Sequence, residues 1–237
     1  MPDPNTANRT STRDLGHEVL GAVLRIRDGR VGVLLWQRAR QPDVHRWSLP
    51  GGKLAADEDV ETSVRRQLAE KVDVRTLSHV EQLAVFSRPD RVPGARLVAT
   101  AFLALVPTSV DPEIPADTAW WPVDELPETA FDHEQIVHAA RDRLRAKLSY
   151  TNIGFALAPA EFTVSELRRI YSAALGYEVA ATNLQRVLTR RGALEPTGDT
   201  VPAGPAGGRP PALFRFASRD LAVTDPFAVF RPPGPGN

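Results

Sequence analysis

The chain has 237 residues, 42% of them hydrophobic, so it is long enough to build one large folded core or two modest ones. Its 29 basic side chains balance its 29 acidic ones, and the lack of cysteine excludes disulfides, thiolate metal sites and cysteine nucleophiles. With no signal peptide and no apolar run of the ~20 residues that a membrane helix needs, we expect a cytoplasmic protein without membrane partners.

The first apolar signals along the chain are two short runs, residues 19–26 and 31–36. They flank the dipeptide Asp28-Gly29, which is typical of a two-residue hairpin turn with a positive φ at both positions. This segment therefore predicts an antiparallel hairpin near the start of a sheet.

The middle of the chain alternates helix and strand signals. A charged amphipathic helix is expected within residues 58–74, and apolar runs at 80–87 and 97–106 predict two further strands. Residues 132–147 have apolar side chains at helical spacing, which predicts a second long helix. Strands that enclose helices indicate a mixed α/β sandwich.

The last third of the chain predicts a winged helix-turn-helix. Thr163 followed three residues later by Glu166 is a capping-box pattern at the start of one helix, and residues 181–191 predict the second. The alternating segment 209–216 predicts a strand of the wing.

These signals divide the chain into four parts, two folded and two terminal. The terminal parts are polar or rich in proline and glycine, so we expect them to be disordered. The expected parts are a disordered arm (1–14), an α/β domain (15–150), a winged helix domain (151–225) and a disordered tail (226–237).

The predicted helix within residues 58–74 has a register that resembles the Nudix box, a pattern of one glycine and several glutamates at fixed spacing. Gln67 and Lys71 replace two of its glutamates, and Asp73 replaces a glycine. The positions that match the pattern are Gly52, Glu58, Arg66, Leu68, Glu70 and Val74. The resemblance implies a Nudix α/β/α sandwich.

In the Nudix family, three glutamates on one helix face bind divalent cations beside a substrate diphosphate. Here Gln67 is neutral, and Lys71 cancels the charge of Glu70. Unit charges about 4 Å apart interact by roughly 4 kcal/mol at a surface-like dielectric, so a dication would be repelled unless the Lys71 ammonium turned into solvent. We therefore expect no metal site, no catalytic residues and no efficient hydrolysis.

The combination of a degenerate Nudix box and a C-terminal winged helix resembles the Nudix-related transcriptional regulators of NAD metabolism. The resemblance implies a dimeric repressor of NAD biosynthesis or salvage genes that binds palindromic operator DNA. It also implies that the Nudix domain senses ADP-ribose or a related NAD-derived nucleotide as effector, with no cofactor required. Further segments that support the resemblance are 86–91, 121–127, 131–133 and 208–210.

Phosphate recognition suits planar guanidinium groups, and an adenine suits an aromatic platform. Trp47 or Phe86 could stack on the base, although Trp47 fits a core position equally well and surface arginines are often only solvated. The candidate ligand-binding residues are Arg38, Trp47, Gly51, Gly52, Phe86, Arg88, Arg91 and Arg96.

For DNA, the second helix of a winged helix domain enters the major groove by its N-terminal part. Its first polar residues would meet base edges, its last arginines would meet phosphates, and the arginines of the wing would meet the backbone or the minor groove. The candidate DNA-binding residues are Thr182, Asn183, Arg186, Arg190, Arg191, Arg209 and Arg215.

Two other functions remain open at this point. One is a Nudix hydrolase, an ADP-ribose pyrophosphatase, that carries an accessory domain. The other is a nucleotide-binding adaptor that neither binds DNA nor hydrolyses its ligand. Gln67 and Lys71 favour the repressor over the hydrolase, and the predicted winged helix favours it over both.

Overall fold

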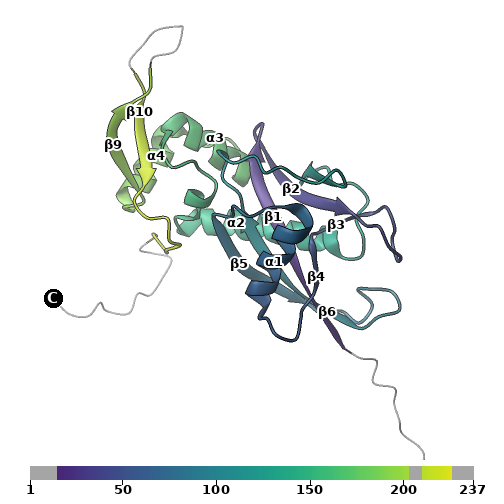
Figure 1. The fold of residues 1–237 in the computed structure, drawn as a ribbon. Helices are drawn as coiled ribbons and strands as arrows, with labels where there is room; N and C mark the ends of the chain where they lie inside the picture. Colours follow the sequence, from purple (N-terminus) through teal and green to yellow (C-terminus); the bar gives the residue numbers. More distant parts are fainter. Residues whose placement is uncertain (1–14, 203–209, 226–237) are drawn as a thin grey trace, which may run out of the picture.

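The computed structural model describes residues 15–202 and 210–225, so the expected arm and tail lie outside the described residues. Figure 1 shows two parts: a layered α/β part that contains α1 and α2, and a smaller helical part that ends in the β9–β10 hairpin. None of the described helices combines the length and the apolar composition that crossing a membrane requires.

A seven-stranded sheet forms the centre of the α/β part. Its strands are β1 (Gly16–Arg27), β2 (Arg30–Gln37), β3 (Trp47–Ser48), β4 (Gly51–Lys53), β5 (His79–Phe86), β6 (Leu97–Leu105) and β7 (Thr118–Pro122). The order across the sheet is β3-β2-β1-β6-β5, with β4 paired to β1 and β7 paired to β2. β1 and β6 run parallel and the other pairs are antiparallel, so the sheet is mixed.

Two helices cover the two faces of this sheet, α1 (Val60–Val72) and α2 (His133–Tyr150). Side chains of β1 alternate between them: Val23 packs in the cluster that contains α1, and Leu24 packs in the cluster that contains α2. Both are fully buried. This period of two, with apolar residues on both faces, produces the predicted α/β/α sandwich.

The hairpin between β1 and β2 confirms the prediction from Asp28-Gly29. Arg27 faces Arg30 across the pair, which leaves a two-residue loop. Asp28 and Gly29 have φ values of 51° and 74°, the positive pair that this turn requires.

Side chains and backbone conformation set both ends of α1. Asp59 begins the helix, because its Oδ1 accepts a hydrogen bond of 2.7 Å from the Thr62 amide. Asp73 ends it in the left-handed conformation, with φ of 52°. Asp73 thus adopts the conformation for which the Nudix pattern keeps a glycine, and aspartate is one of the few residues that tolerates it.

The smaller part follows α2 directly. Its elements are η1 (Ile153–Ala156), β8 (Phe162–Thr163), α3 (Val164–Leu175), α4 (Ala181–Arg190), β9 (Leu194–Thr200) and β10 (Ala212–Phe216). The strands form a sheet in the order β8-β10-β9. Two helices followed by this hairpin make the predicted winged helix. The predicted capping box of α3 is confirmed, since Thr163 and Glu166 each accept a bond from the other's amide, at 3.2 and 2.7 Å.

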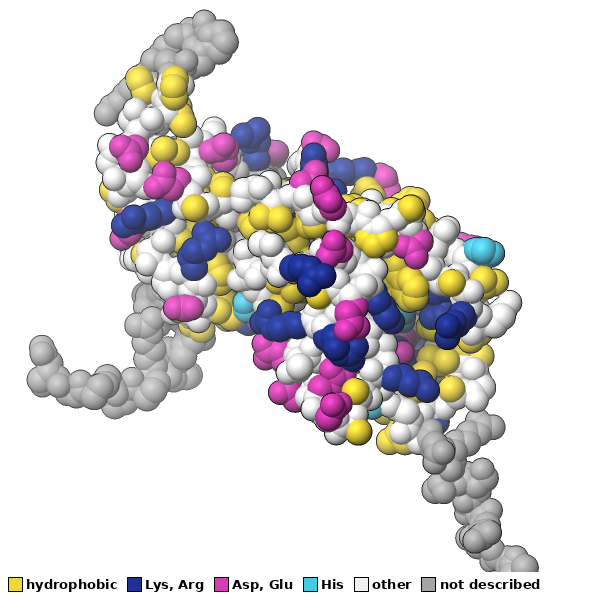
Figure 2. Space-filling model, in the orientation of Figure 1, with side chains coloured by type: hydrophobic (Ala, Val, Ile, Leu, Met, Phe, Trp, Pro, Cys, Tyr) yellow, Lys and Arg dark blue, Asp and Glu magenta, His cyan; other side chains and the backbone are white. Residues whose placement is uncertain are grey.

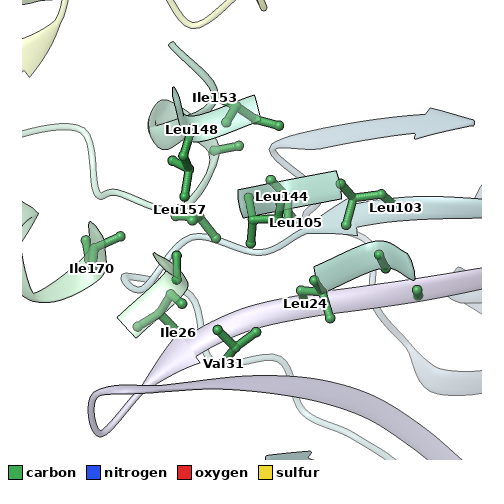
Figure 3. Close-up of a cluster of buried hydrophobic side chains, with 14 of the residues drawn as sticks. Leu24, Ile26, Val31, Leu103, Leu105, Leu144, Leu148, Ile153, Leu157 and Ile170 are labelled. Carbon is green, nitrogen blue, oxygen red and sulfur yellow. The ribbon is translucent and has the colours of Figure 1, made fainter. Parts of the chain in front are cut away.

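One hydrophobic cluster spans both parts. Figure 3 shows Leu24 of the sheet, Leu144 of α2, Ile153 of η1 and Ile170 of α3 around the same region. Each of these side chains is at most 5% exposed. Because the cluster is continuous, α2 and the winged helix share a packed core and are not joined only by a linker.

The segment after β10 returns to the junction of the two parts. The Asn152 amide group donates to the carbonyls of Ser218 and Asp220, at 3.3 and 2.9 Å, and its oxygen accepts from the Ala222 amide at 2.7 Å. The amide of Thr224 donates to the Tyr150 carbonyl at the end of α2, at 2.9 Å. These bonds attach the end of the winged helix to the end of α2.

Candidate functional site

Two residues of the degenerate Nudix box, Glu58 and Arg66, form a bidentate ion pair. The Arg66 guanidinium donates to both Glu58 oxygens, at 2.6 and 2.9 Å, and to Glu70 at 3.1 Å. Hydrogen bonds from Arg66 lower the pKa of Glu58 to about 2. Glu58 therefore serves as the ionised partner of Arg66, and Glu70 remains largely exposed.

Lys71 does not turn into solvent. Its half-buried ammonium donates to the carbonyl of Gly51 and lies 5.3 Å from the ring centroid of Trp36. Burial lowers the pKa of Lys71, and the charge of Arg66 lowers it further. A carbonyl oxygen and an aromatic face both attract a cation, so the chain holds this charge at a fixed point beside β4.

Gln67 and the two candidate glycines are tightly packed. A Cβ atom on Gly52 would lie 2.8 Å from the Gln67 amide, and one on Gly51 would lie 2.9 Å from the Leu20 Cα, so both glycines allow close approach. Gln67 is buried, and its Oε1 has no hydrogen-bond partner among the described residues.

These residues do not fit a divalent metal. Magnesium prefers several anionic oxygens, whereas this helix face presents an amide, one carboxylate and an ammonium. In the described part of the chain, no three side chains of His, Cys, Asp or Glu come together in a way that could hold a metal ion.

The structure corrects the prediction for Arg91, whose side chain is fully buried. Its guanidinium donates to Glu18 at 2.5 Å and to both oxygens of Asp132, at 2.8 and 3.0 Å. Two carboxylates therefore occupy the group that was expected to meet a phosphate. Arg91 instead connects β1 to the residue that precedes α2.

A cavity of about 420 Å³ lies beside this ion pair. The predicted residues Arg88 and Arg91 line it, together with Arg46 and Phe131, which were not among the predicted ligand-binding residues. Arg88 is exposed and pairs with Asp90 at 2.9 Å, a surface pair that a ligand can displace.

Arg38 reaches the same region. Its guanidinium lies 4.6 Å from the ring centroid of Phe131, and its Nε donates to the Pro42 carbonyl at 3.0 Å. Three of the four predicted arginines therefore gather around Phe131, whereas Arg96 donates to the Ser87 carbonyl at 3.0 Å.

The two predicted aromatic platforms both pack against the core. Trp47 meets the ring of Trp121 edge to face, with centroids 5.3 Å apart, and Phe86 packs on the same hydrophobic cluster. Of the two readings of Trp47, the structure favours the core position.

A second cavity, of about 1060 Å³, lies where the two parts of the molecule meet. The β1–β2 hairpin, including Asp28 and Arg30, lines one side, and α3 with the turn after it, including Arg169 and Tyr177, lines the other. None of the predicted ligand-binding residues lines it. The predicted set therefore points to the smaller cavity.

Helix α4 presents a polar face to solvent. Leu184 and Leu188 are buried, whereas the predicted residues Thr182, Asn183, Arg186 and Arg190 are exposed. The Arg186 guanidinium donates to the Asn183 side chain at 2.7 Å, which holds two candidate base-reading groups side by side.

Arg191, the last predicted DNA-binding residue of this helix, is held within the protein. Its guanidinium donates to the Ser149 carbonyl at 2.9 Å and to the Asp225 carboxylate at 2.5 Å, and its side chain is only 13% exposed. Arg191 thus links α4 to the end of α2, and both of its terminal nitrogens already have a partner within the protein. In the wing, Arg215 is exposed and pairs with Glu195 at 2.6 Å, and Arg209 lies outside the described residues.

The surface charges are mixed on the face in Figure 2, where basic and acidic side chains lie interspersed. This agrees with the equal numbers of basic and acidic residues in the chain. On this face, a DNA contact would therefore depend on the positions of individual arginines.

Comparison with known proteins supports both halves of this architecture. The NUDIX domain model matches residues 17–140, and the model of the NrtR DNA-binding winged helix domain matches residues 154–216. An ADPR-responsive transcriptional repressor, NtrR, of Acinetobacter baylyi is 29% identical over 212 residues, which cover 86% of this chain and 83% of that protein.

Two further relatives represent a regulator and an enzyme. The crystal structure of Shewanella oneidensis NrtR with a 27mer DNA is 31% identical, with a TM-score of 0.71, over 84% of this chain and 92% of that one. An ADP-ribose pyrophosphatase of Methanocaldococcus jannaschii is 31% identical over 121 residues, 48% of this chain and 67% of that protein. Because the match to NrtR extends through both domains and the enzyme matches about half of the chain, this chain belongs to the NrtR family of Nudix-related transcriptional regulators.

Proposed function

We propose that this protein represses genes of NAD biosynthesis or salvage and leaves its operator when ADP-ribose, or a related NAD-derived nucleotide, binds the Nudix domain. The observation that carries the proposal is the exposed polar face of α4 in the winged helix. This winged helix shares its hydrophobic core with the Nudix domain, and the residues of the Nudix box do not fit a metal. Relatives that match through both domains support the proposal.

On the DNA side, α4 enters the major groove. Arg186 and Asn183 suit bidentate contacts to guanine and adenine, and Arg190 at the end of the helix suits a phosphate. Arg215 on the wing contacts the backbone after leaving Glu195. The protein binds as a two-fold dimer to a palindrome whose half-sites lie about 10 base pairs apart, or a multiple of that.

On the ligand side, the diphosphate lies beside the cavity of about 420 Å³, and Arg38 and Arg88 contact its oxygens. Arg91 acts through position and not through contact, since Glu18 and Asp132 occupy its donors. Arg46 joins the set because it lines the same cavity.

The direct test is operator binding measured by fluorescence anisotropy, with DNA from upstream of the protein's own gene and of neighbouring NAD-related genes. We expect tight binding that saturating ADP-ribose weakens, with AMP and NAD as comparison ligands. A scrambled duplex of equal length is the control for nonspecific binding. Equal affinity for both duplexes excludes the repressor function, and an unchanged operator affinity with every NAD-derived nucleotide excludes the sensor function.

The competing proposal is an ADP-ribose pyrophosphatase with an accessory domain. It is favoured by the similarity to the Methanocaldococcus jannaschii enzyme over the Nudix part, and by Glu58 and Glu70, which remain from the box. An assay for the products of ADP-ribose hydrolysis separates the two proposals.

A further inference from the structure

We propose that the ammonium of Lys71 takes the place of a divalent cation in this Nudix domain, so that a diphosphate-bearing nucleotide binds without metal and contacts Lys71 directly. This inference rests on the proposed function, because it states how the same ligand is held. The proposed function is compatible with a sensor that needs magnesium to bind its nucleotide. The present inference predicts that magnesium is not needed.

The first argument is position. Residues 67, 70 and 71 share one helix face at i, i+3 and i+4 spacing, the face that binds the cation in Nudix enzymes. Lys71 brings a positive charge to that face, and Gln67 removes a negative one. Both substitutions therefore make the local charge more positive, as a bound divalent cation would.

The second argument is that Lys71 is held in place. Its ammonium donates to the Gly51 carbonyl and faces the Trp36 ring at 5.3 Å, while its half-buried side chain packs between α1 and β4. An ammonium has three N–H donors, and the carbonyl uses one of them. A fixed ammonium with further donors can contact phosphate oxygens at little cost in side-chain entropy.

The third argument is that the neighbouring carboxylates have other partners. Glu58 is bound by Arg66 at 2.6 and 2.9 Å, and Glu18 is bound by Arg91 at 2.5 Å. Neither forms an ion pair with Lys71 in the described structure. Among the described residues, the Lys71 ammonium therefore has no carboxylate in direct contact, and an anionic ligand can take that place.

The test is calorimetric titration of ADP-ribose into the full chain, once with EDTA and once with magnesium. We expect the wild-type dissociation constants in the two buffers to agree within about twofold. Lys71→Met keeps the apolar stem and removes the charge, and we expect binding to weaken by about 10- to 100-fold in both buffers, as for loss of one charge-assisted hydrogen bond. Lys71→Arg, which keeps the charge, should bind without magnesium.

Lys53→Met is the matched control, because Lys53 is an exposed lysine on the neighbouring strand β4. It should bind like the wild type, and thermal melts show whether each variant is folded. If Lys71→Met does not fold, Lys71→Gln, which also removes the charge, replaces it with the same expected loss. Wild-type binding that requires magnesium, or Lys71→Met binding as tight as wild type, overturns the inference and leaves the proposed function standing. A wild-type chain that binds neither ADP-ribose nor another NAD-derived nucleotide in either buffer overturns both.

Discussion

The arginines at the candidate site differ in how firmly carboxylates of the protein hold their charges. Arg91 is fully buried between Glu18 and Asp132, whereas Arg88 is 70% exposed beside Asp90. Both lie in one loop and both line the same cavity, so they form a matched pair for separating stability from ligand binding.

Replacing Arg91 with methionine should destabilise the fold. The change leaves two partly buried carboxylates without their cation, which typically costs about 3–5 kcal/mol. Arg88→Ala, on the surface, should change stability by less than about 0.5 kcal/mol. Urea denaturation at neutral pH measures both free energies of unfolding, and equal values for the two variants contradict the structural role of Arg91.

His133 should make stability depend on pH. Its Nδ1 accepts a hydrogen bond of 2.9 Å from the Leu49 amide, and burial lowers its pKa to about 3 from an ordinary value of 6.5. Between these values the unfolded chain binds one proton more than the folded one. Stability is therefore fully present above pH 6.5 and falls by about 1.4 kcal/mol per unit as the pH decreases toward 3.

His133→Asn tests this contribution, because the asparagine oxygen can accept the same bond and does not titrate. Below pH 6.5, the free energy of unfolding should fall less steeply with decreasing pH in the variant than in the wild type, by about 1.4 kcal/mol per pH unit. Urea denaturation at several pH values above about 4 gives both slopes. Equal slopes for the two proteins would show that His133 does not cause the pH dependence of stability.

Hydrolysis of ADP-ribose with magnesium should be very slow or absent. Gln67 and Lys71 remove two carboxylates that the reaction needs, and product formation far below the roughly 10 per second of ordinary enzymes is expected. The double change Gln67→Glu and Lys71→Glu should raise turnover, with Lys53→Glu as the control for added negative charge. Turnover at an ordinary enzyme rate by the wild type contradicts the regulator reading and supports the hydrolase.

At the residue scale, the sequence predicts which chemical groups a site contains better than it predicts which residues contact one another. The altered box is visible in the chain because the spacing of Gln67 and Lys71 fixes their place on a helix. Nothing near Arg91 indicates that it is buried, since its partners Glu18 and Asp132 lie 73 and 41 residues away in the chain.

At the element scale, local signals predict the structure well. The structure confirms the Asp28-Gly29 turn and the capping box of α3, because each depends on residues within one turn of chain. Arg191 was different. Its position at the end of a basic helix suggested a phosphate contact, but Asp225, 34 residues later, folds back to bind it.

Two substitutions on the polar face of α4 should distinguish contacts to bases from contacts to phosphates. Arg186→Ala should weaken operator binding by about 1–3 kcal/mol and reduce the preference for operator over scrambled DNA. Arg190→Ala should weaken both duplexes equally and reduce the slope of affinity against salt. Anisotropy titrations at several salt concentrations measure all these quantities. Wild-type behaviour of both variants would mean that α4 does not read the operator.

At the scale of the whole molecule, α2 connects the two candidate sites. It follows Asp132, the partner of Arg91 beside the ligand cavity, and it ends at Tyr150, whose carbonyl accepts from Thr224 and Asp225. The shared core keeps α2 and the winged helix packed together. A small displacement at the start of α2 can therefore reach the winged helix as a rigid-body shift, which would change the separation of two α4 helices in a dimer.

This arrangement predicts reciprocal coupling. ADP-ribose should weaken operator binding, and operator DNA must weaken ADP-ribose binding by the same factor, with typical couplings of about 5- to 150-fold. Two titrations measure it: operator binding at saturating ADP-ribose, and ADP-ribose binding at saturating operator. Unequal factors would mean that the two ligands are not linked through one equilibrium.

Asp225→Asn tests the route that the coupling takes. Arg191 binds both Asp225 and the Ser149 carbonyl, so the change weakens the attachment of α4 to the end of α2 without touching either candidate site. We expect the variant to bind ADP-ribose like the wild type and to bind the operator in its absence, but with a smaller coupling factor. Asp220→Asn, an exposed change in the same segment, is the control and should keep the full factor. If Asp225→Asn also keeps it, the signal does not depend on this attachment, and the packed core between α2 and α3 becomes the route to test.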